Sequence, residues 1–275
     1  MPSHATQQRP PAGTDTDVQE RVNARMWARR DLVGKYANRN LRPAEVTFLV
    51  RYRDEIGPRV LELGCGAGRL TGYLAELFDD VHGIDVNSAM LEHCARAYPK
   101  VHTALGDMTD LSAYADASFQ TVIAAFNVVD VLTDESRRAL LDEVHRILAP
   151  DGLFLLCAHN LAAAGSIPDV MKAHRQPPLR AAITLARLPR WLINRRRVRP
   201  LERRERDYAV LNDVSHDFAG LHYYIDAEGQ ERQLAEHGFE VLEILDREGR
   251  TVAAADDTAS SSDLHYVARP GSAAA

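Results

Sequence analysis

The sequence has little of what would place it among secreted, metal-binding or membrane proteins. Its 275 residues include only three cysteines, Cys65, Cys94 and Cys157, which show neither the CxxC spacing of a zinc site nor the even number of a disulfide framework. No run reaches the roughly 20 apolar residues of a membrane span. The N-terminus also lacks the charged-then-apolar order of a signal peptide. We therefore expect a cytoplasmic protein with no metal site and no membrane partner.

Lysine is almost absent, with Lys35, Lys100 and Lys172 set against thirty arginines. Such a skew is typical of coding bias, so arginine richness alone says little about function. The net charge is −6, which provides no general attraction for a polyanion, and we expect no nucleic-acid partner. Hydrophobic residues at 45% and charged residues at 26% are ordinary for a globular enzyme.

From residue 59 onward, short apolar runs alternate with amphipathic helical segments, a pattern typical of βα units around a parallel sheet. Asn87 or Ser88, and later Thr133, stand where helix N-caps are expected. The pattern predicts an α/β fold with a seven-stranded, mostly parallel sheet and helices on both faces. The predicted strands are Arg59–Leu63, Val81–Asp85, 101–105, Phe119–Phe126, Leu153–Ala158, 239–245 and 264–268.

A glycine-rich turn follows the first predicted strand. Gly64, Gly66 and Gly68 occupy alternate positions between a strand and a helix, where a tight bend lets a ligand approach the main chain without meeting a Cβ atom. A dinucleotide fingerprint requires glycine three positions after its second glycine. Arg69 and Thr71 stand at the corresponding offsets, so the turn does not fit that fingerprint.

The E-x-G-x-G-x-G segment within 60–71 resembles motif I of the class I S-adenosylmethionine-dependent methyltransferases, and the resemblance extends over roughly residues 60–158. It implies a Rossmann-like fold, S-adenosylmethionine (SAM) as cofactor and the small-molecule type of enzyme. Asp85 then corresponds to the acid that binds both ribose hydroxyls, and Glu62 to the acid that helps orient the methionine end. Gly106, Asp107 and Met108 correspond to the segment that meets the adenine.

The resemblance also implies that N-terminal aromatic residues fold over the cofactor. Tyr36 is expected to reach the methionyl carboxylate, whereas Trp27 is equally consistent with a core aromatic. Cys65 is a small residue in the turn rather than a nucleophile. The complete set expected to bind the cofactor is Tyr36, Glu62, Gly64, Cys65, Gly66, Gly68, Asp85, Val86, Gly106, Asp107, Met108 and Phe126.

With this assignment the chain divides into five segments. We expect a disordered tail over 1–16, N-terminal helices over 17–56 and the SAM-binding core over 57–159. A helical substrate lid over 160–228 interrupts the core after the fifth strand. A helix and an antiparallel edge hairpin over 229–270 complete it.

Methyl transfer requires alignment, a dry site and, for a hydroxyl acceptor, a base. Candidates must lie at the carboxyl ends of strands. Asn127 and Asp130, at the end of the fourth strand segment, are candidates to line the acceptor site, and His159, at the end of the fifth strand, is the first choice for a base. The alternative for His159 is a hydrogen-bonded histidine that fixes the following loop. His222, with Tyr223 and Tyr224, suits a pocket wall, or else an edge strand with aromatic packing.

Nine arginines lie within residues 187–206, from Arg187 to Arg206 inclusive. Three explanations remain open: the polar face of a helical lid, capture of an acidic acceptor by guanidinium groups, or contact with RNA or an anionic membrane. Pro189 is expected to interrupt a long basic helix, which weighs against the membrane.

The function predicted from these observations is transfer of a methyl group from SAM to a small organic acceptor, at oxygen or a non-planar nitrogen. An acidic acceptor remains open as one explanation of the arginines, and the protein is expected to be a monomer or homodimer. Two alternatives remain: a non-catalytic SAM-fold binding or regulatory protein, and an RNA or protein methyltransferase.

Overall fold

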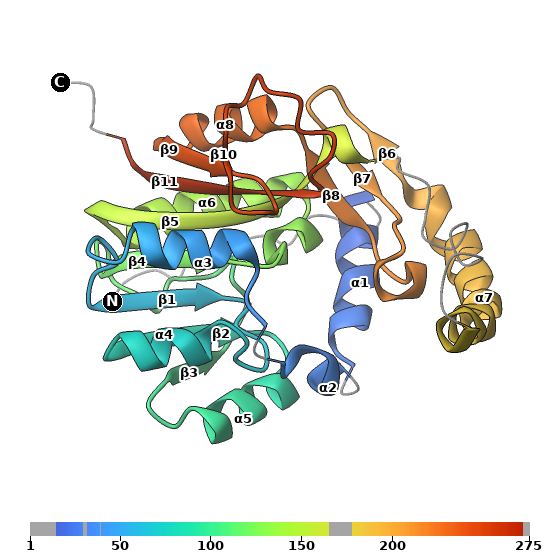
Figure 1. Ribbon diagram of the computed structural model, residues 1–275, viewed down its shortest axis with the longest axis horizontal. Coiled ribbons are helices and arrows are strands. Elements are labelled where there is room, and N and C mark those ends of the chain that lie inside the picture. The colour runs from blue at the N-terminus through green and yellow to red at the C-terminus, as the bar shows by residue number, and fades with distance from the viewer. Residues whose placement is uncertain (1–14, 30–31, 39, 165–177, 272–275) are drawn as a thin grey trace, which may run out of the picture.

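A central sheet of eleven strands organises the computed structural model, which describes residues 15–29, 32–38, 40–164 and 178–271 (Figure 1). The main path runs β10–β9–β11–β5–β4–β1–β2–β3, and β6, β7 and β8 join it at β5. The bounds are β1 Arg59–Leu63, β2 Asp80–Asp85, β3 His102–Leu105, β4 Phe119–Ala124, β5 Leu148–Asn160, β6 Arg203–Arg204, β7 Tyr208–Leu211, β8 His222–Ile225, β9 Phe239–Leu245, β10 Thr251–Val252 and β11 Asp263–Pro270.

The strands from β3 to β5 are parallel, because a helix returns the chain between most successive strands. Val60 on β1 is paired with Val81 on β2 and with Thr121 on β4, so β1 lies at the centre of this parallel group. The carboxyl ends of these strands point toward helix α1 (Figure 1). The helices are α1 Asp15–Trp27, α2 Val33–Tyr36, α3 Pro43–Arg51, α4 Thr71–Leu77, α5 Ser88–Ala97, α6 Asp134–Ile147, α7 Pro178–Val198 and α8 Ala227–Glu236.

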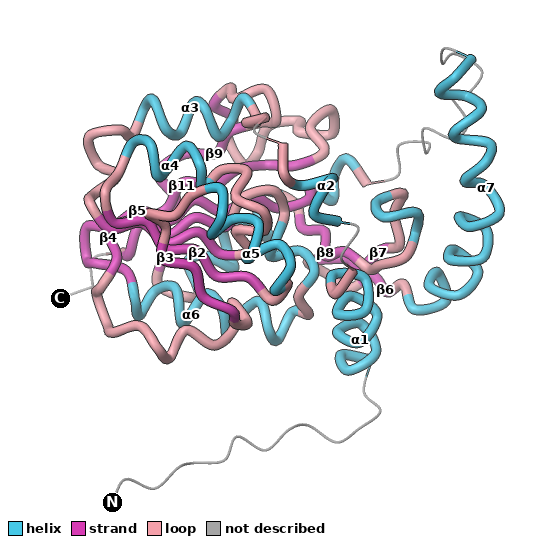
Figure 2. Tube along the Cα trace, turned by 90° about the horizontal axis from the view of Figure 1, so that it is seen from below, coloured by secondary structure: helices cyan, strands magenta, loops and turns pink. Residues whose placement is uncertain are grey.

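Each face of the sheet has its own hydrophobic core. On one face, Phe48 of α3 and Leu74 of α4 pack with Val60 and Ile123 of the strands. On the other face, buried residues of α6 and α8 pack against the same sheet. Figure 2 shows α3 and α4 on one side of the strands and α6 on the other. The prediction of helices on both faces is therefore confirmed.

The predicted helix starts have the expected chemistry. The side-chain oxygen of Asn87 accepts hydrogen bonds from the backbone N–H groups of Ala89 and Met90, which makes Asn87 the N-cap of α5. Thr133 caps α6 in the same way by accepting from the N–H of Ser136. These two caps determine where each helix begins: α5 starts shortly after the end of β2, and α6 starts after the 3-10 turn Val128–Val131 that follows β4.

The sheet is larger than the predicted seven strands. The seven expected strands are all present, with β5 extended in both directions, and β6, β7, β8 and β10 are added to them. β11 lies between β9 and β5 rather than at the edge, because it pairs antiparallel with both. The two-residue strand β10 takes the edge position beside β9.

The insertion after β5 is only partly helical. It contains α7, and then β6, β7 and β8, of which β8 pairs parallel with the end of β5 through His159 and Tyr224. The prediction of a helical lid therefore holds for α7 only, because the aromatic and β-branched segments of β7 and β8 form sheet pairings instead. Pro189 also does not interrupt the helix as expected, since α7 continues through it.

Helix α1 is anchored across the carboxyl ends of the strands. Asn23 donates two hydrogen bonds through Nδ2, to the carbonyl oxygen of Val131 at 2.7 Å and to that of Leu221 at 2.8 Å. The predicted tail over 1–16 lies outside the described residues as far as residue 14, and α1 begins at Asp15. Within the described residues, no helix has the length and apolar character needed to cross a membrane.

Candidate functional site

A pocket opens at the carboxyl ends of β1, β2 and β4, where α/β sheets of this kind bind ligands. It encloses about 830 Å³ of space, part of it open to solvent. Ten of the twelve residues predicted to bind the cofactor line this pocket, and Asn127 also lines it. The lining residues are Trp27, Tyr36, Glu62, Gly64, Cys65, Gly66, Ala67, Arg69, Ile84, Asp85, Val86, Met90, Gly106, Met108, Ala125, Phe126, Asn127, Val128 and Val131.

The glycine turn forms one wall of this pocket with bare main chain. Gly64 has a φ of +62°, and a Cβ atom there would lie 2.1 Å from Cγ2 of Val128, so only glycine fits. Gly66 has a φ of +54° and faces more open space, since the nearest atom to a Cβ would be Met90 Sδ at 3.4 Å. Gly68 does not line the pocket. A Cβ there would meet the Tyr98 ring at 2.6 Å, so Gly68 lets the turn pack against the residue after α5.

Asp85 lies at the end of β2 with its carboxylate beside this turn. Its Oδ2 accepts a hydrogen bond from the N–H of Gly66 at 2.8 Å, and its Oδ1 accepts one from the N–H of Asn87 at 2.8 Å. Burial raises the pKa of Asp85, although these backbone N–H groups act in the opposite direction. The carboxylate thus holds the bend in place while lining the pocket.

Glu62 lies deeper, at the floor of the pocket. Its Oε2 accepts a hydrogen bond from the Thr71 hydroxyl at 2.5 Å. Burial raises the pKa of Glu62 to about 8, against smaller lowering contributions from Thr71 and Arg69. A carboxyl group in this state is largely protonated at neutral pH and can donate a hydrogen bond toward a ligand.

The segment after β3 is only partly in the pocket. Gly106 and Met108 line it, and the N–H of Gly106 donates to the carbonyl oxygen of Asp85 at 3.1 Å. Asp107 is exposed, and its Oδ1 accepts hydrogen bonds from the backbone and hydroxyl of Thr109. The two residues on either side of Asp107 are therefore in place for a ligand, and Asp107 itself lies outside the lining.

The chain after β4 enters the pocket in an unusual conformation. Phe126 and Asn127 have φ values of +57° and +60°, a region that non-glycine residues rarely adopt. The Phe126 ring packs against two guanidinium groups, with Arg42 4.1 Å and Arg69 4.6 Å from its centroid. Arg69 is fixed in turn by two hydrogen bonds to the carboxylate of Glu45, at 2.7 and 2.5 Å. Such strain concentrates at ligand sites when its surroundings enforce it.

Beyond Asn127 the structure forms a buried aspartate–histidine pair. Asp130 Oδ2 accepts the backbone N–H of His159 at 2.6 Å and lies 2.7 Å from Nδ1 of the same residue. Its Oδ1 accepts from Arg137 at 2.8 Å, and Asn127 Nδ2 donates to Oδ2 at 3.2 Å. Burial alone would raise the pKa of Asp130, but His159 and Arg137 outweigh it and hold the pKa below its usual value. His159 therefore connects to the pocket through Asp130 and Asn127.

His222 belongs to a second pair, at the start of β8. Its Nδ1 lies 3.1 Å from Oδ2 of Asp213, which also accepts the Tyr224 hydroxyl at 2.6 Å. The Tyr224 ring stacks on His159 with centroids 4.8 Å apart, and the His222 ring lies 5.6 Å from His159. His222 is buried and does not line the pocket, and Tyr223 instead donates its hydroxyl to Asp134 at 2.7 Å. The segment is a strand with aromatic packing, as the edge-strand alternative held, but β8 lies between β5 and β7 rather than at an edge.

His216 contacts the pocket lining directly and lies in the same candidate segment, 215–224, as His222, although the sequence pattern predicted no role for it. Its Nε2 lies 3.0 Å from the hydroxyl of Tyr36, and its ring meets Trp27 edge-on at 4.9 Å. His216, Asp217 and Phe218 all have left-handed φ values, between +51° and +64°. No local pattern marks His216, because its role depends on a contact with a residue 180 positions earlier.

Several of the nine arginines between Arg187 and Arg206 form contacts within the chain. Arg187 and Arg190 pair with Asp217, whose carboxylate also accepts the Trp191 indole N–H at 2.7 Å. Arg195 lies over the Phe218 ring at 4.9 Å. Arg197 lines a second cavity between α1 and α7, together with Arg21, Arg25 and Arg29. Arg187, Arg190 and Arg195 therefore hold α7 against the left-handed turn of residues 216–218, and Arg197 contributes to the basic cavity.

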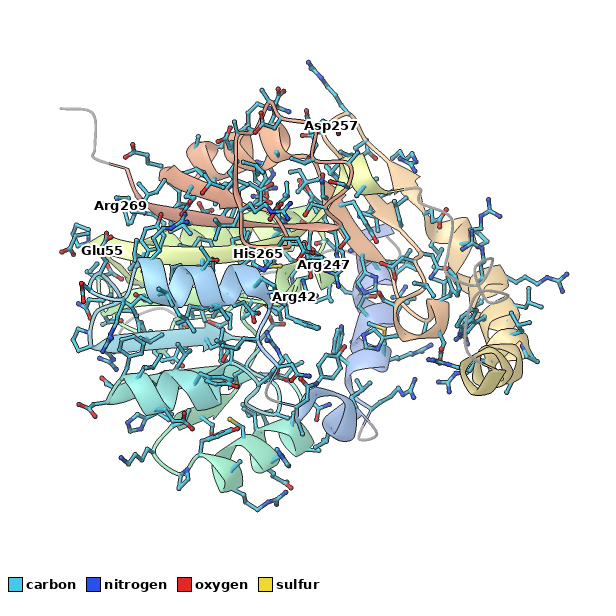
Figure 3. The ribbon with its side chains drawn as sticks, viewed as in Figure 1. Arg42, Glu55, Arg247, Asp257, His265 and Arg269 are labelled. Carbon is cyan, nitrogen blue, oxygen red and sulfur yellow. The ribbon has the colours of Figure 1, made fainter. Side chains whose placement is uncertain are left out.

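A buried trio lies behind Phe126, on neighbouring strands. The trio consists of Cys157 on β5 and of Asp263 and His265 on β11. One ligand-type atom from each of the three side chains lies within 4.8 Å of the other two. Arg42 forms an ion pair with Asp263 and approaches Cys157 Sγ at 3.9 Å. Figure 3 labels Arg42 and His265 in this region. Because a guanidinium already supplies the positive charge here, the trio does not need a metal ion for charge balance.

Residues 60–152 match the model of a family described as a methyltransferase domain. Among curated proteins, a probable S-adenosylmethionine-dependent methyltransferase of Mycolicibacterium smegmatis is 34% identical over 104 residues, which span 38% of this chain and 39% of that protein. A fatty-acid O-methyltransferase of the same organism is 33% identical over 130 residues, covering 46% and 45%. The matched region thus spans about half or less of these relatives.

Solved structures match over much more of the chain. The CcbJ methyltransferase of Streptomyces caelestis superposes with a TM-score of 0.57 over 90% of this chain and 98% of its own, at 18% identity. A Burkholderia thailandensis 1,6-didemethyltoxoflavin-N1-methyltransferase, solved with its substrate and S-adenosylhomocysteine, gives 0.59 over 96% and 93%, at 13% identity. At such identities the likeness establishes the fold alone.

Proposed function

Because residues 60–152 belong to the methyltransferase domain family and the chain has the class I methyltransferase fold, we propose that it transfers a methyl group from SAM to a small organic acceptor. The observation that carries the proposal is that the glycine turn and the carboxylate of Asp85, which accepts the N–H of Gly66, line the same pocket. Asp85 would accept hydrogen bonds from the ribose hydroxyls, and the turn would support the methionine end. SAM supplies the electrophilic methyl group when bound.

The acceptor would enter on the side of Phe126, Asn127 and Tyr36. This side combines apolar and aromatic walls with few polar groups, which suits a small organic molecule. Methyl transfer from a sulfonium is an in-line displacement, so the main tasks of this wall are alignment and exclusion of water. Relatives that are named for small-molecule acceptors support this acceptor class. We further propose that the methyl group is transferred to oxygen or to a non-planar nitrogen.

His159 is the proposed general base for an acceptor that must lose a proton. Asp130, held by Arg137, lies against Nδ1 of His159, which leaves Nε2 as the nitrogen for proton transfer. The His159 side chain keeps 19% of its surface exposed, and it connects to the pocket lining through Asp130 and Asn127. Asn127 would position the acceptor, while the buried His222 would act by holding the neighbouring rings.

The test is turnover of SAM with a panel of phenols, carboxylic acids and amines, detected as S-adenosylhomocysteine and as methylated product. We expect S-adenosylhomocysteine to bind with 1:1 stoichiometry and at least one class of acceptor to be methylated. Saturable binding without turnover of any acceptor would favour the non-catalytic alternative. Activity on RNA that falls steeply with salt would favour the RNA methyltransferase, because phosphate contacts make binding strongly salt-dependent.

A further inference from the structure

A second cluster of ligand-type side chains lies at the opposite end of β2 from Asp85. Asp80 begins β2 and His82 follows two positions later, so both side chains lie on the same face of the sheet. His102 begins β3 and pairs directly with His82 in the parallel register. Asp80 lies five residues and His82 three residues before Asp85, so their Cα atoms are roughly 17 and 10 Å from that of Asp85 along the strand. None of the three residues of the cluster lines the cofactor pocket. The two sites are therefore separate.

The three side chains converge on one point. His82 Nε2 lies 2.8 Å and His102 Nε2 3.8 Å from the same carboxylate oxygen, Oδ1 of Asp80. All three ligand-type atoms lie within 4.8 Å of one another. Ligand atoms around a tetrahedral zinc ion are about 3.4 Å apart, given bonds of about 2.0–2.1 Å. The observed separations bracket that value, so small side-chain rotations would complete the geometry.

We propose that Asp80, His82 and His102 form a binding site for a divalent transition metal ion, with zinc as the best match. Two imidazole nitrogens and one carboxylate oxygen match the ligand preference of zinc and its neighbours rather than that of magnesium or calcium. Three protein ligands leave a fourth position for water. Because β3 is the edge strand of the main path, a metal ion here would bind that strand to β2 and stabilise the fold.

His82 is the ligand that its surroundings already hold in place. The His82 ring meets Phe119 edge-on at 5.3 Å and Tyr114 at 6.3 Å, and it stacks on His102 at 4.8 Å. The His82 side chain is 14% exposed, whereas the His102 side chain is 65% exposed. His102 is thus the ligand that can adjust and that leaves the ion accessible from solvent.

Among the residues that the structure describes, Arg59 is the one cationic side chain paired with this cluster, so its replacement tests the proposed metal site. Its Nε lies 3.4 Å from Oδ2 of Asp80, the oxygen that faces away from the histidines, and its guanidinium lies over Phe119 at 4.9 Å. Arg59 and a metal ion would therefore use different oxygens of Asp80. Their mutual repulsion would still weaken metal binding, so removing the charge of Arg59 should strengthen it.

The experiment uses the full chain without an affinity tag, stripped with a chelator and titrated with zinc chloride by calorimetry. Cobalt is titrated in parallel, because the visible spectrum of cobalt reports its coordination geometry. We expect one ion per chain, at least ten-fold weaker binding for His102→Ala, and a few-fold tighter binding for Arg59→Gln. Zinc should also raise the melting temperature of the wild type and leave that of His102→Ala unchanged.

His93→Ala is the matched control, since it removes a histidine of α5 outside the cluster. Binding of S-adenosylhomocysteine by His102→Ala at the wild-type level would show that the variant is folded. Absence of saturable zinc binding, equal affinity in His102→Ala and wild type, or an equal loss in His93→Ala would overturn the proposal. So would loss of binding in Cys157→Ser with His102→Ala unaffected, because the ion would then lie in the buried trio.

Discussion

Replacement of Asp85 by alanine is the most direct perturbation of the proposed cofactor site. The carboxylate has two functions in the structure: it accepts the N–H groups of Gly66 and Asn87, and it presents its outer face to the pocket. Truncation removes the proposed hydrogen bonds to the ribose and also leaves two backbone N–H groups without their acceptor. Both losses act in the same direction on cofactor affinity.

The expected size follows from these contacts. A hydrogen bond to a charged group contributes about 1.5–3 kcal/mol, and part of that is recovered by water in a pocket that is open to solvent. We therefore expect Asp85→Ala to lose about 2–3 kcal/mol of binding free energy for S-adenosylhomocysteine, which is roughly a 30- to 150-fold weaker Kd. Asp85→Asn keeps one acceptor oxygen and most of the side-chain volume, so its loss should be intermediate.

Isothermal titration calorimetry with S-adenosylhomocysteine measures this change, and thermal unfolding of the free protein reports damage to the bend. Asp110→Ala is the matched control, because Asp110 is an exposed carboxylate whose Oδ1 accepts only from Ser112. A Kd for Asp85→Ala within two-fold of the wild type would refute the assignment of the ribose site. A loss as large in Asp110→Ala would refute it equally.

Three further changes test the buried polar groups. Burial raises the pKa of Glu62 from 4.5 to about 8, so the stability contributed by its bound proton is complete below pH 4.5 and is lost as the pH rises through 8. Glu62→Gln should therefore gain thermal stability relative to the wild type between pH 5 and 9. Arg137→Met leaves Asp130 buried without its cationic partner and should cost about 3–5 kcal/mol in urea unfolding. His159→Asn should lower kcat at least 100-fold, the lower end of the usual contribution of a general base, with little change in S-adenosylhomocysteine affinity.

Each of these changes has a result that contradicts it. If the melting temperatures of Glu62→Gln and the wild type changed in parallel between pH 5 and 9, Glu62 would keep an ordinary pKa in the folded protein. Arg138→Met removes a half-exposed ion pair with Asp134 and should cost less than about 1 kcal/mol, so an equal cost for the two arginine variants would argue against a special role for the buried pair. Equal losses of kcat and of cofactor affinity in His159→Asn would identify His159 as a structural residue.

The sequence alone determined the features that depend on local order. The strand, the glycine turn and the following helix can be read from consecutive residues, because hydrophobic period and the absence of a Cβ are properties of a short segment. Asp85 follows from the same logic, since it ends the next strand in a parallel sheet. All seven predicted strands and the caps at Asn87 and Thr133 are present in the structure.

Only the tertiary structure decided which distant side chains contact one another beside the pocket. Asp130 reaches His159 and Tyr36 reaches His216 because strand pairing and the left-handed turn bring together residues 29 and 180 positions apart. Two of the nine arginines that stood out in the sequence, Arg187 and Arg190, pair with Asp217 and hold α7 against it. Contacts of this kind depend on how the elements pack, and the periodicity of a single segment carries no information about its distant neighbours.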